Sequence, residues 1–221
     1  MYSDGASTCS SSVSAFCTRP DLLVVDEAIY EPLITGVTLS RANVKVFAHN
    51  DMKDLRRVLE QVRAADKKKG IRSDAQRKFL VVEGLYRNTG SVVPLDEVVK
   101  LKEEFGYRII LDESHSFGVL GNTGRGVTEL FGLKPMKDIE ITTISLENAI
   151  GSIGGITAGS DEVVDHQRLS GSGYVFSASS PPFTATAAIK SLELLENQPE
   201  SVSKLSRNVQ YLQKKLHSLC Q

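Results

Sequence analysis

The stretch RIILDESHSFG, residues 108–118, joins a short apolar run to a polar end. We interpret residues 108–112 as a buried strand that ends on Asp112, with His115 three residues further on. Residues 22–26 (LLVVD) and 79–83 (FLVVE) have the same form. Continuous apolar runs, rather than alternating ones, are typical of a parallel sheet covered on both faces. The sequence therefore predicts an α/β fold with a mostly parallel sheet.

Helices are predicted between these strands. Asn50 or Asp51 begins one, since either side chain can accept from the unpaired amides of a first helical turn, and the run 67–70 (KKKG) ends it. Another helix follows Pro94. The remaining predicted elements are strands at 44–47, 139–145 and 153–158, and helices at 161–169, 184–196 and 205–221.

The amino-acid composition argues against several classes of protein. The 221 residues carry a net charge of −1, with 41% hydrophobic and 24% charged residues. Apolar residues are too frequent for a disordered chain, and the charge balance argues against nucleic-acid binding by bulk charge. No apolar run reaches the roughly 18 residues that span a bilayer. Three cysteines, Cys9, Cys17 and Cys220, are too few for a disulfide framework and suggest a reducing compartment.

Asp112 and His115 are the candidate chemical groups, because ligands of parallel sheets bind beyond the carboxyl ends of strands. A helicase box would need a phosphate loop, yet the chain contains no Gly-Lys pair. A serine hydrolase would need a Gly-x-Ser-x-Gly turn, which is also missing. No metal site is predicted, since the histidines at 49, 115, 166 and 217 are dispersed. A purely structural role, in which the two residues cap the next element, stays open.

Two glycine-rich segments follow, GVLGNTGRG at 118–126 and SLENAIGSIGG at 145–155. The chain thus carries, in order, Asp-x-x-His, a glycine-rich arm, and a polar residue before a glycine-rich loop. This order of motifs resembles that of the fold-type I pyridoxal-phosphate (PLP) enzymes. More narrowly, the chain resembles the α-oxoamine synthases, which condense an amino acid with an acyl-CoA. The segments that carry the likeness are HNDM (49–52), VEG (82–84), LDESH (111–115), GRG (124–126) and FSASSPP (176–182).

The resemblance implies an aminotransferase-like large domain and a set of cofactor positions. Asp112 would lie against the pyridine nitrogen of PLP and His115 near its phenolic oxygen. Tyr30 takes the place of the histidine that stacks on the ring, and Ser179 is a further cofactor-contacting position. The lysine that would form the Schiff base falls on Asn148, and a carboxamide is no nucleophile. The cofactor-contacting serine of the Glu-Gly loop falls on Arg87.

The resemblance is more specific in three segments, which are similar to the lysine-lacking subunits of heteromeric α-oxoamine synthases. These segments are 82–90, 147–149 and 165–171. No lysine occurs between Lys137 and Lys190. The resemblance thus implies a heterodimer in which a lysine-bearing partner holds PLP at the interface and condenses serine with palmitoyl-CoA for sphingolipid biosynthesis. Residues 177–182 would reach across that interface. The parent protein would lie at the cytosolic face of the endoplasmic reticulum membrane.

Two other functions stay open: a PLP-dependent synthase active by itself through another lysine, and an inactive truncated product. The unusual start and the helix that runs to Gln221 suggest a fragment. We expect residues 1–198 to form a partial large domain without its N-terminal part. Residues 199–221 would be a helix that leads toward an absent small domain.

Overall fold

The computed structural model describes residues 1–70, 76–198 and 200–219. It contains a six-stranded sheet in the order β2-β1-β3-β4-β5-β6, in which β1 to β5 are parallel and β6 is antiparallel to β5. The strands are β1 (Leu22–Asp26), β2 (Asn43–Phe47), β3 (Lys78–Glu83), β4 (Arg108–Asp112), β5 (Ile141–Ser145) and β6 (Gly155–Gly159). The predicted mostly parallel α/β fold is confirmed; Cys220 lies outside the described residues.

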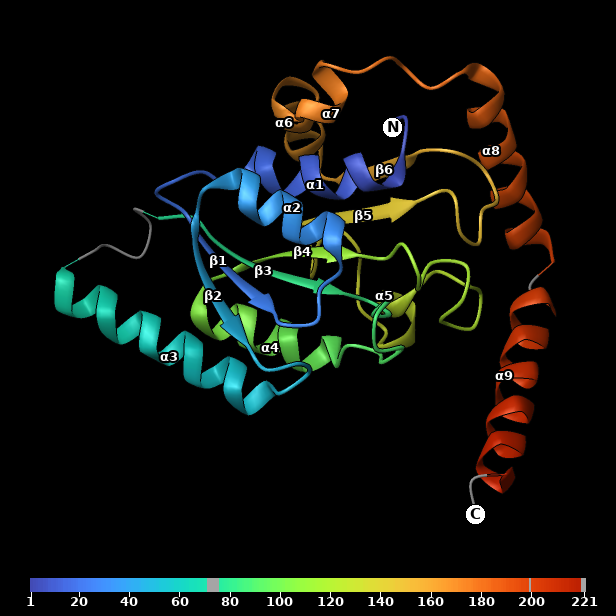
Figure 1. Cartoon of the computed structure of the whole chain (residues 1–221), viewed down its shortest axis with the longest axis horizontal. Helices are drawn as coiled ribbons and strands as arrows, with labels where there is room; N and C mark the ends of the chain where they lie inside the picture. The colour runs from blue at the N-terminus through green and yellow to red at the C-terminus, as the bar shows by residue number, and fades with distance from the viewer. Residues whose placement is uncertain (71–75, 199, 220–221) are drawn as a thin grey trace.

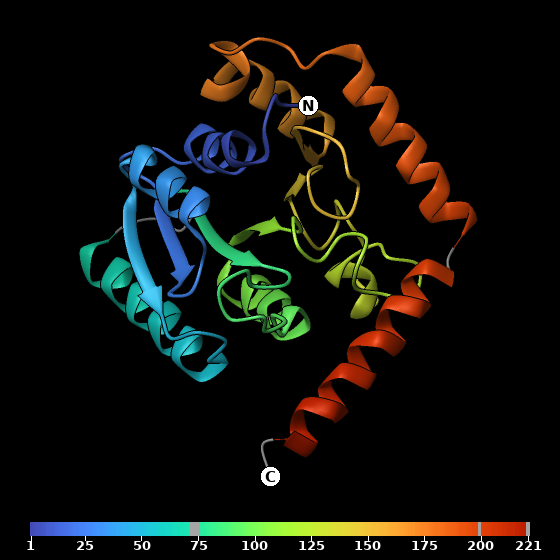
Figure 2. The ribbon, with the colours of Figure 1, turned by 45° about the vertical axis from the view of Figure 1, so that its right-hand side comes forward.

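Helices cover both faces of the sheet (Figures 1 and 2). One face carries α1 (Gly5–Phe16), α2 (Glu31–Ser40), α6 (Asp161–Ser170) and α7 (Ser172–Val175), and the other carries α3 (Met52–Lys69) and α4 (Leu95–Phe105). The short α5 (Val127–Leu130) follows β4, and α8 (Pro182–Asn197) and α9 (Glu200–Leu219) run down one side of the molecule.

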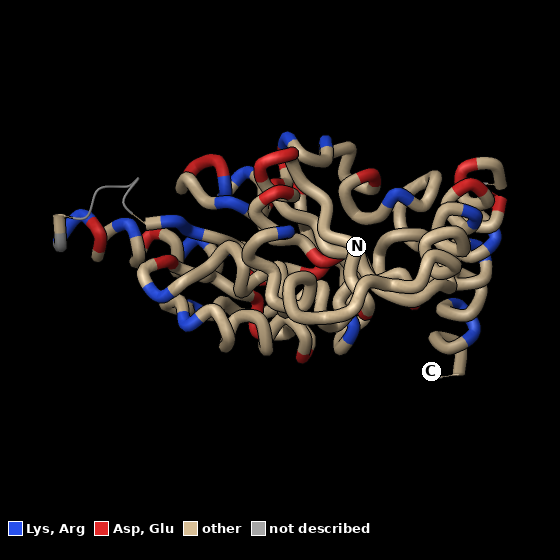
Figure 3. The backbone as a smooth tube through the Cα atoms, turned by 90° about the horizontal axis from the view of Figure 1, so that it is seen from above, with Lys and Arg blue, Asp and Glu red and all other residues tan. Residues whose placement is uncertain are grey.

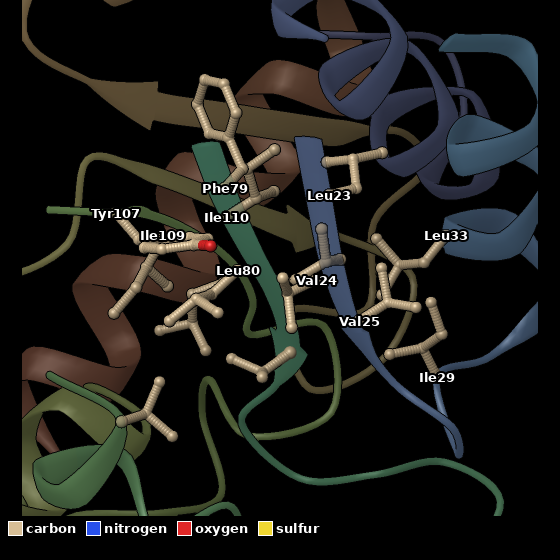
Figure 4. Close-up of a cluster of buried hydrophobic side chains, with 14 of the residues drawn as sticks. Leu23, Val24, Val25, Ile29, Leu33, Phe79, Leu80, Tyr107, Ile109 and Ile110 are labelled. Atoms are coloured by element: carbon tan, nitrogen blue, oxygen red, sulfur yellow. The ribbon is translucent and has the colours of Figure 1, made fainter. Parts of the chain in front are cut away.

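The core lies around the central strands. Every residue of β1 is buried, as are all but the first residues of β3 and β4. Figure 4 shows why these strands are apolar throughout: side chains such as Leu23, Leu80 and Ile110 stand on both sides of the sheet. Because successive side chains of a strand point to opposite faces, a strand between two helical layers needs no polar positions. Burying each such side chain contributes about 1.5–3 kcal/mol.

The predicted limits of α3 are confirmed. Asp51 is its N-cap, and the carboxylate accepts from the backbone N–H groups of Lys53 and Asp54 at 2.9 and 3.0 Å. The helix ends at Gly70, whose φ of 65° is left-handed and suits a residue without a Cβ.

The sequence analysis missed α1 and α2. Residues 6–14 of α1 look like a run of small residues, yet Asp4 caps the helix and Cys9, Val13 and Phe16 recur at helical spacing on its buried side. Small residues let α1 and α2 pack closely. A Cβ built on Gly36 of α2 would lie 2.8 Å from the carbonyl oxygen of Ser10.

Gly36→Ala is therefore expected to destabilise the chain, although alanine is the better helix former. The new methyl group would meet the backbone of α1, which can only give way by moving the helix. We expect a loss of about 1–3 kcal/mol in the free energy of unfolding, measured by urea denaturation. The exposed neighbour Thr35→Ala is the control, with an expected change within about 0.5 kcal/mol. An unchanged stability of Gly36→Ala would contradict the close packing.

The last helix begins five residues before the predicted Leu205, at Glu200. Val202 in its first turn is buried, but the later apolar positions Leu205, Val209, Leu212 and Leu216 are exposed in this chain. Among the described residues, no helix is both long and apolar enough to cross a membrane. Acidic and basic residues are interspersed along the described chain (Figure 3).

Candidate active site

The carboxyl ends of β1, β3 and β4 bring three acidic side chains together. They lie at one edge of the sheet, the edge formed by the carboxyl ends of its parallel strands. They are Asp26, Glu83 and Asp112, and all three are buried. Glu83 and Asp112 are paired in register on neighbouring strands. The sheet edge at which ligands of α/β proteins bind is thus lined with carboxylates, as the three strand ends predicted.

Asp112 is enclosed by side chains from α1, from β5 and from the loop after β4. Its Oδ1 accepts from the hydroxyls of Ser114 and Thr143 at 2.7 and 2.8 Å, and the Sγ of Cys9 lies 3.4 Å away. Its Oδ2 is buried without a hydrogen-bond partner among the described residues. Burial raises the pKa of Asp112 above its usual range despite these donors. Its described partners are side chains, which argues against the alternative role as a helix cap.

Glu83 and His115 complete a cluster with Asp112. One potential ligand atom from each of the three lies within 4.8 Å of the others. Both oxygens of Glu83 already accept from backbone amides, those of Tyr30 at 2.7 Å and Arg87 at 3.0 Å. Burial lowers the pKa of His115, although the nearby Asp112 opposes the shift. The cluster is therefore a pair of carboxylates beside an imidazole whose burial favours the neutral form.

Tyr30 lies beside this cluster but faces inward. It is only 5% exposed, and its hydroxyl is 2.9 Å from the Sγ of Cys9 on α1. Its ring meets that of His115 edge-on, with centroids 6.0 Å apart. Burial raises the pKa of Tyr30 well above its usual value. The hydroxyl therefore stays protonated and links α1 to the sheet edge through Cys9. Sequence reasoning missed Cys9, which only the helical spacing of α1 would have placed there.

Asn148, which the resemblance assigns to the position of the family's lysine, lies close to the same edge. Its Nδ2 donates to the carbonyl oxygen of Ser114 at 2.7 Å, which ties the loop after β5 to the loop after β4. The side chain thus takes a structural role that an amide can fill.

Ser179 is not part of this arrangement. It is exposed in the loop between α7 and α8, and within the described residues it makes no hydrogen bond to Asp112, His115 or Tyr30. Arg87 is exposed as well, and it adjoins the cluster through the bond from its backbone amide to Glu83.

The residues fit PLP at one end only. The unpartnered Oδ2 of Asp112 could accept from a protonated ring nitrogen. Asn148, however, cannot form an imine with the aldehyde, and burial of Tyr30 leaves little of its ring open for stacking. As a complete cofactor site, the residues of this chain do not fit.

The fold and the strand-tip carboxylate are those of the PLP-dependent transferases of fold type I. Residues 1–219 match the family model described as aminotransferase class I and II, and the chain belongs to that family.

Relatives carry more particular names. Long chain base biosynthesis protein 1b of Oryza sativa subsp. japonica is 46% identical over 216 residues, which cover 98% of this chain and 44% of the relative. Serine palmitoyltransferase 1 of Dictyostelium discoideum is 46% identical, over 95% of this chain and 43% of its own length. The structure of the Sphingomonas wittichii serine palmitoyltransferase superposes with a TM-score of 0.88 at 26% identity, over 98% of this chain and 51% of that one. These likenesses confirm the resemblance seen in the sequence. The chain spans less than half the length of the curated relatives it matches.

Proposed function

We propose that this chain is the lysine-lacking subunit of a serine palmitoyltransferase. In this role it supports the PLP-dependent condensation of serine with palmitoyl-CoA to 3-ketosphinganine, the entry to sphingolipid biosynthesis. The observation that carries the proposal is Asn148, which the resemblance assigns to the position of the family's lysine and whose side-chain amide donates to the carbonyl oxygen of Ser114. A separate lysine-bearing subunit then holds PLP, and the full-length protein acts at the cytosolic face of the endoplasmic reticulum membrane.

The loop before α8 supports a partnered role. Residues 177–182 are almost entirely exposed, and two aromatic side chains flank them in the open: Phe176 is 87% exposed and Phe183 is 68% exposed. Exposed aromatic side chains are enriched at protein interaction surfaces. We assign this loop to the contact with the lysine-bearing subunit, where Ser179 would take part in the shared site.

Co-purification with the lysine-bearing subunit tests the proposal. We expect the tagged chain to retain that subunit, and the pair to form 3-ketosphinganine from serine and palmitoyl-CoA. Phe176→Asp is expected to lower the retained amount at least tenfold, because it places a charge in the contact. Val46→Asp is the control, since Val46 is also exposed, at 53%, but lies on the edge strand β2, away from α7 and α8. Failure of the unmodified chain to retain the subunit would contradict the proposal.

The chain alone is expected to form no adduct with PLP. After incubation with PLP and reduction with borohydride, mass spectrometry should find no lysine of the chain modified in stoichiometric amount. A stoichiometric reduced adduct, together with synthase activity of the isolated chain, would instead favour an enzyme that works by itself.

A further inference from the structure

The first turn of α1 lies next to Asn148, the residue assigned to the position of the family's Schiff-base lysine. The backbone amide of Gly5 donates to Oε1 of Glu147, 3.3 Å away, and Glu147 directly precedes Asn148. One turn further along α1, the Sγ of Cys9 lies 3.4 Å from Asp112. These two contacts place the N-terminus of α1 at the same edge of the sheet as Asp112 and Asn148. In Figure 1, this end of α1 lies above the end at which the arrow of β5 points.

Carboxylates accept from two backbone amides of this turn, those of Gly5 and Ser7. Asp4 accepts from the backbone amide of Ser7 at 2.7 Å and from its hydroxyl at 2.6 Å, while Glu147 accepts from Gly5. The unpaired amides and the positive dipole end of a helix N-terminus attract anions in general, phosphate groups among them. Here two anions of the chain itself fill that position.

Glu147 is the unusual one of the two. Asp4 is an ordinary N-cap, as found at many helices. Glu147 comes from 142 residues further along the chain, in the loop after β5, and its side chain reaches back to the first amide of α1. Local capping does not require such a contact. By contrast, the acidic pair Asp161 and Glu162 in the first turn of α6 belongs to its own helix, although its side chains are exposed like that of Glu147.

We propose that Glu147, together with Asp4, is a built-in anion that closes the N-terminus of α1 to the phosphate group of PLP. A phosphate group at this helix N-terminus would compete with Glu147 for the amide of Gly5, and it would meet two negative charges there. Two independent features then prevent this chain from binding PLP. Asn148 supplies no nucleophile, and Glu147 with Asp4 excludes the phosphate group. The inference rests on the proposed function only for the identity of the cofactor.

PLP binding by the full 221-residue chain tests the inference, using equilibrium dialysis and borohydride reduction with peptide mass spectrometry. Asn148→Lys alone is expected to leave PLP binding weak and position 148 unmodified. Asn148→Lys with Asp4→Ser and Glu147→Ser is expected to bind PLP at least tenfold more tightly and to yield a reduced adduct at 148. Serine keeps an N-cap at position 4. The matched control joins Asn148→Lys to Asp161→Ser and Glu162→Ser, which remove two carboxylates from another helix N-terminus, and should behave like Asn148→Lys alone.

Two results would overturn the inference. One is PLP binding by Asn148→Lys as tight as that of the triple variant. The other is a triple variant that is folded by circular dichroism and binds no better. If the triple variant does not fold, Asn148→Lys with Glu147→Gln decides, because glutamine keeps an acceptor for Gly5 and removes the charge; a gain of at least threefold is expected, and no gain rejects the proposal. Since no partner is present in these measurements, their outcome is independent of the co-purification that tests the proposed function.

Discussion

Asp26→Asn is expected to destabilise the chain by about 3–5 kcal/mol, because it removes one acceptor from a fully buried carboxylate network. Oδ1 of Asp26 accepts from the backbone amide of Ala28 and lies 2.8 Å from Nδ1 of His49, while Oδ2 accepts from the amide of Asn50 at 3.0 Å. Donors approach both oxygens, so the amide group of an asparagine must face one of them. The side-chain NH₂ group of the asparagine is then buried without an acceptor, and the connection between β1 and the start of α3 is lost.

Urea denaturation measures this effect. Asp51→Asn is the matched control: Asp51 also accepts from two backbone amides, but it is an exposed N-cap, where asparagine serves equally well. We expect the control to stay within about 0.5 kcal/mol of the unmodified chain. A loss below about 1 kcal/mol for Asp26→Asn would mean that the network contributes little to the folded state.

Much of the fold could be predicted because the central strands carry their own signal. A strand buried on both faces must be apolar along its length, so residues 22–26, 79–83 and 108–112 identify β1, β3 and β4 without further knowledge. The parallel arrangement then places the final carboxylates at one edge. Asp112, Glu83 and His115 were therefore placed correctly at this edge from the sequence, and the structure shows that the three side chains form one cluster.

The remainder depends on contacts that no local pattern encodes. Helix α1 is built from small residues, whose value lies in close approach to α2 and not in their own propensity. The contacts of Cys9 with Tyr30 and of Glu147 with Gly5 join segments far apart in the chain. The exposure of Ser179 likewise follows from where the loop runs and not from its residues. The family resemblance could name Tyr30, Asn148 and Ser179 as positions, but only the structure shows what each of them touches.

Glu83 is expected to make the stability of the chain fall as the pH rises. Burial, opposed by the amides of Arg87 and Tyr30 and aided by the negative charge of Asp112, raises the pKa of Glu83 from 4.5 to about 7. The folded chain therefore holds this proton more tightly than the unfolded chain. The stability that Glu83 contributes is fully present below pH 4.5 and is lost as the pH rises through about 7, a difference of about 3 kcal/mol.

Glu83→Gln removes this titration and should flatten the corresponding part of the pH profile. Glutamine cannot accept from both amides, so the variant is expected to be the less stable protein at pH 4.5. Because it carries no charge to bury, the difference should shift in its favour by about 3 kcal/mol by pH 8. Urea denaturation between pH 4.5 and pH 8 measures the shift, with the exposed Glu60→Gln as the control that should run parallel to the unmodified chain. Parallel profiles for Glu83→Gln would show that the carboxyl of Glu83 is ionised throughout this range, and that the sheet edge tolerates both charges despite their burial.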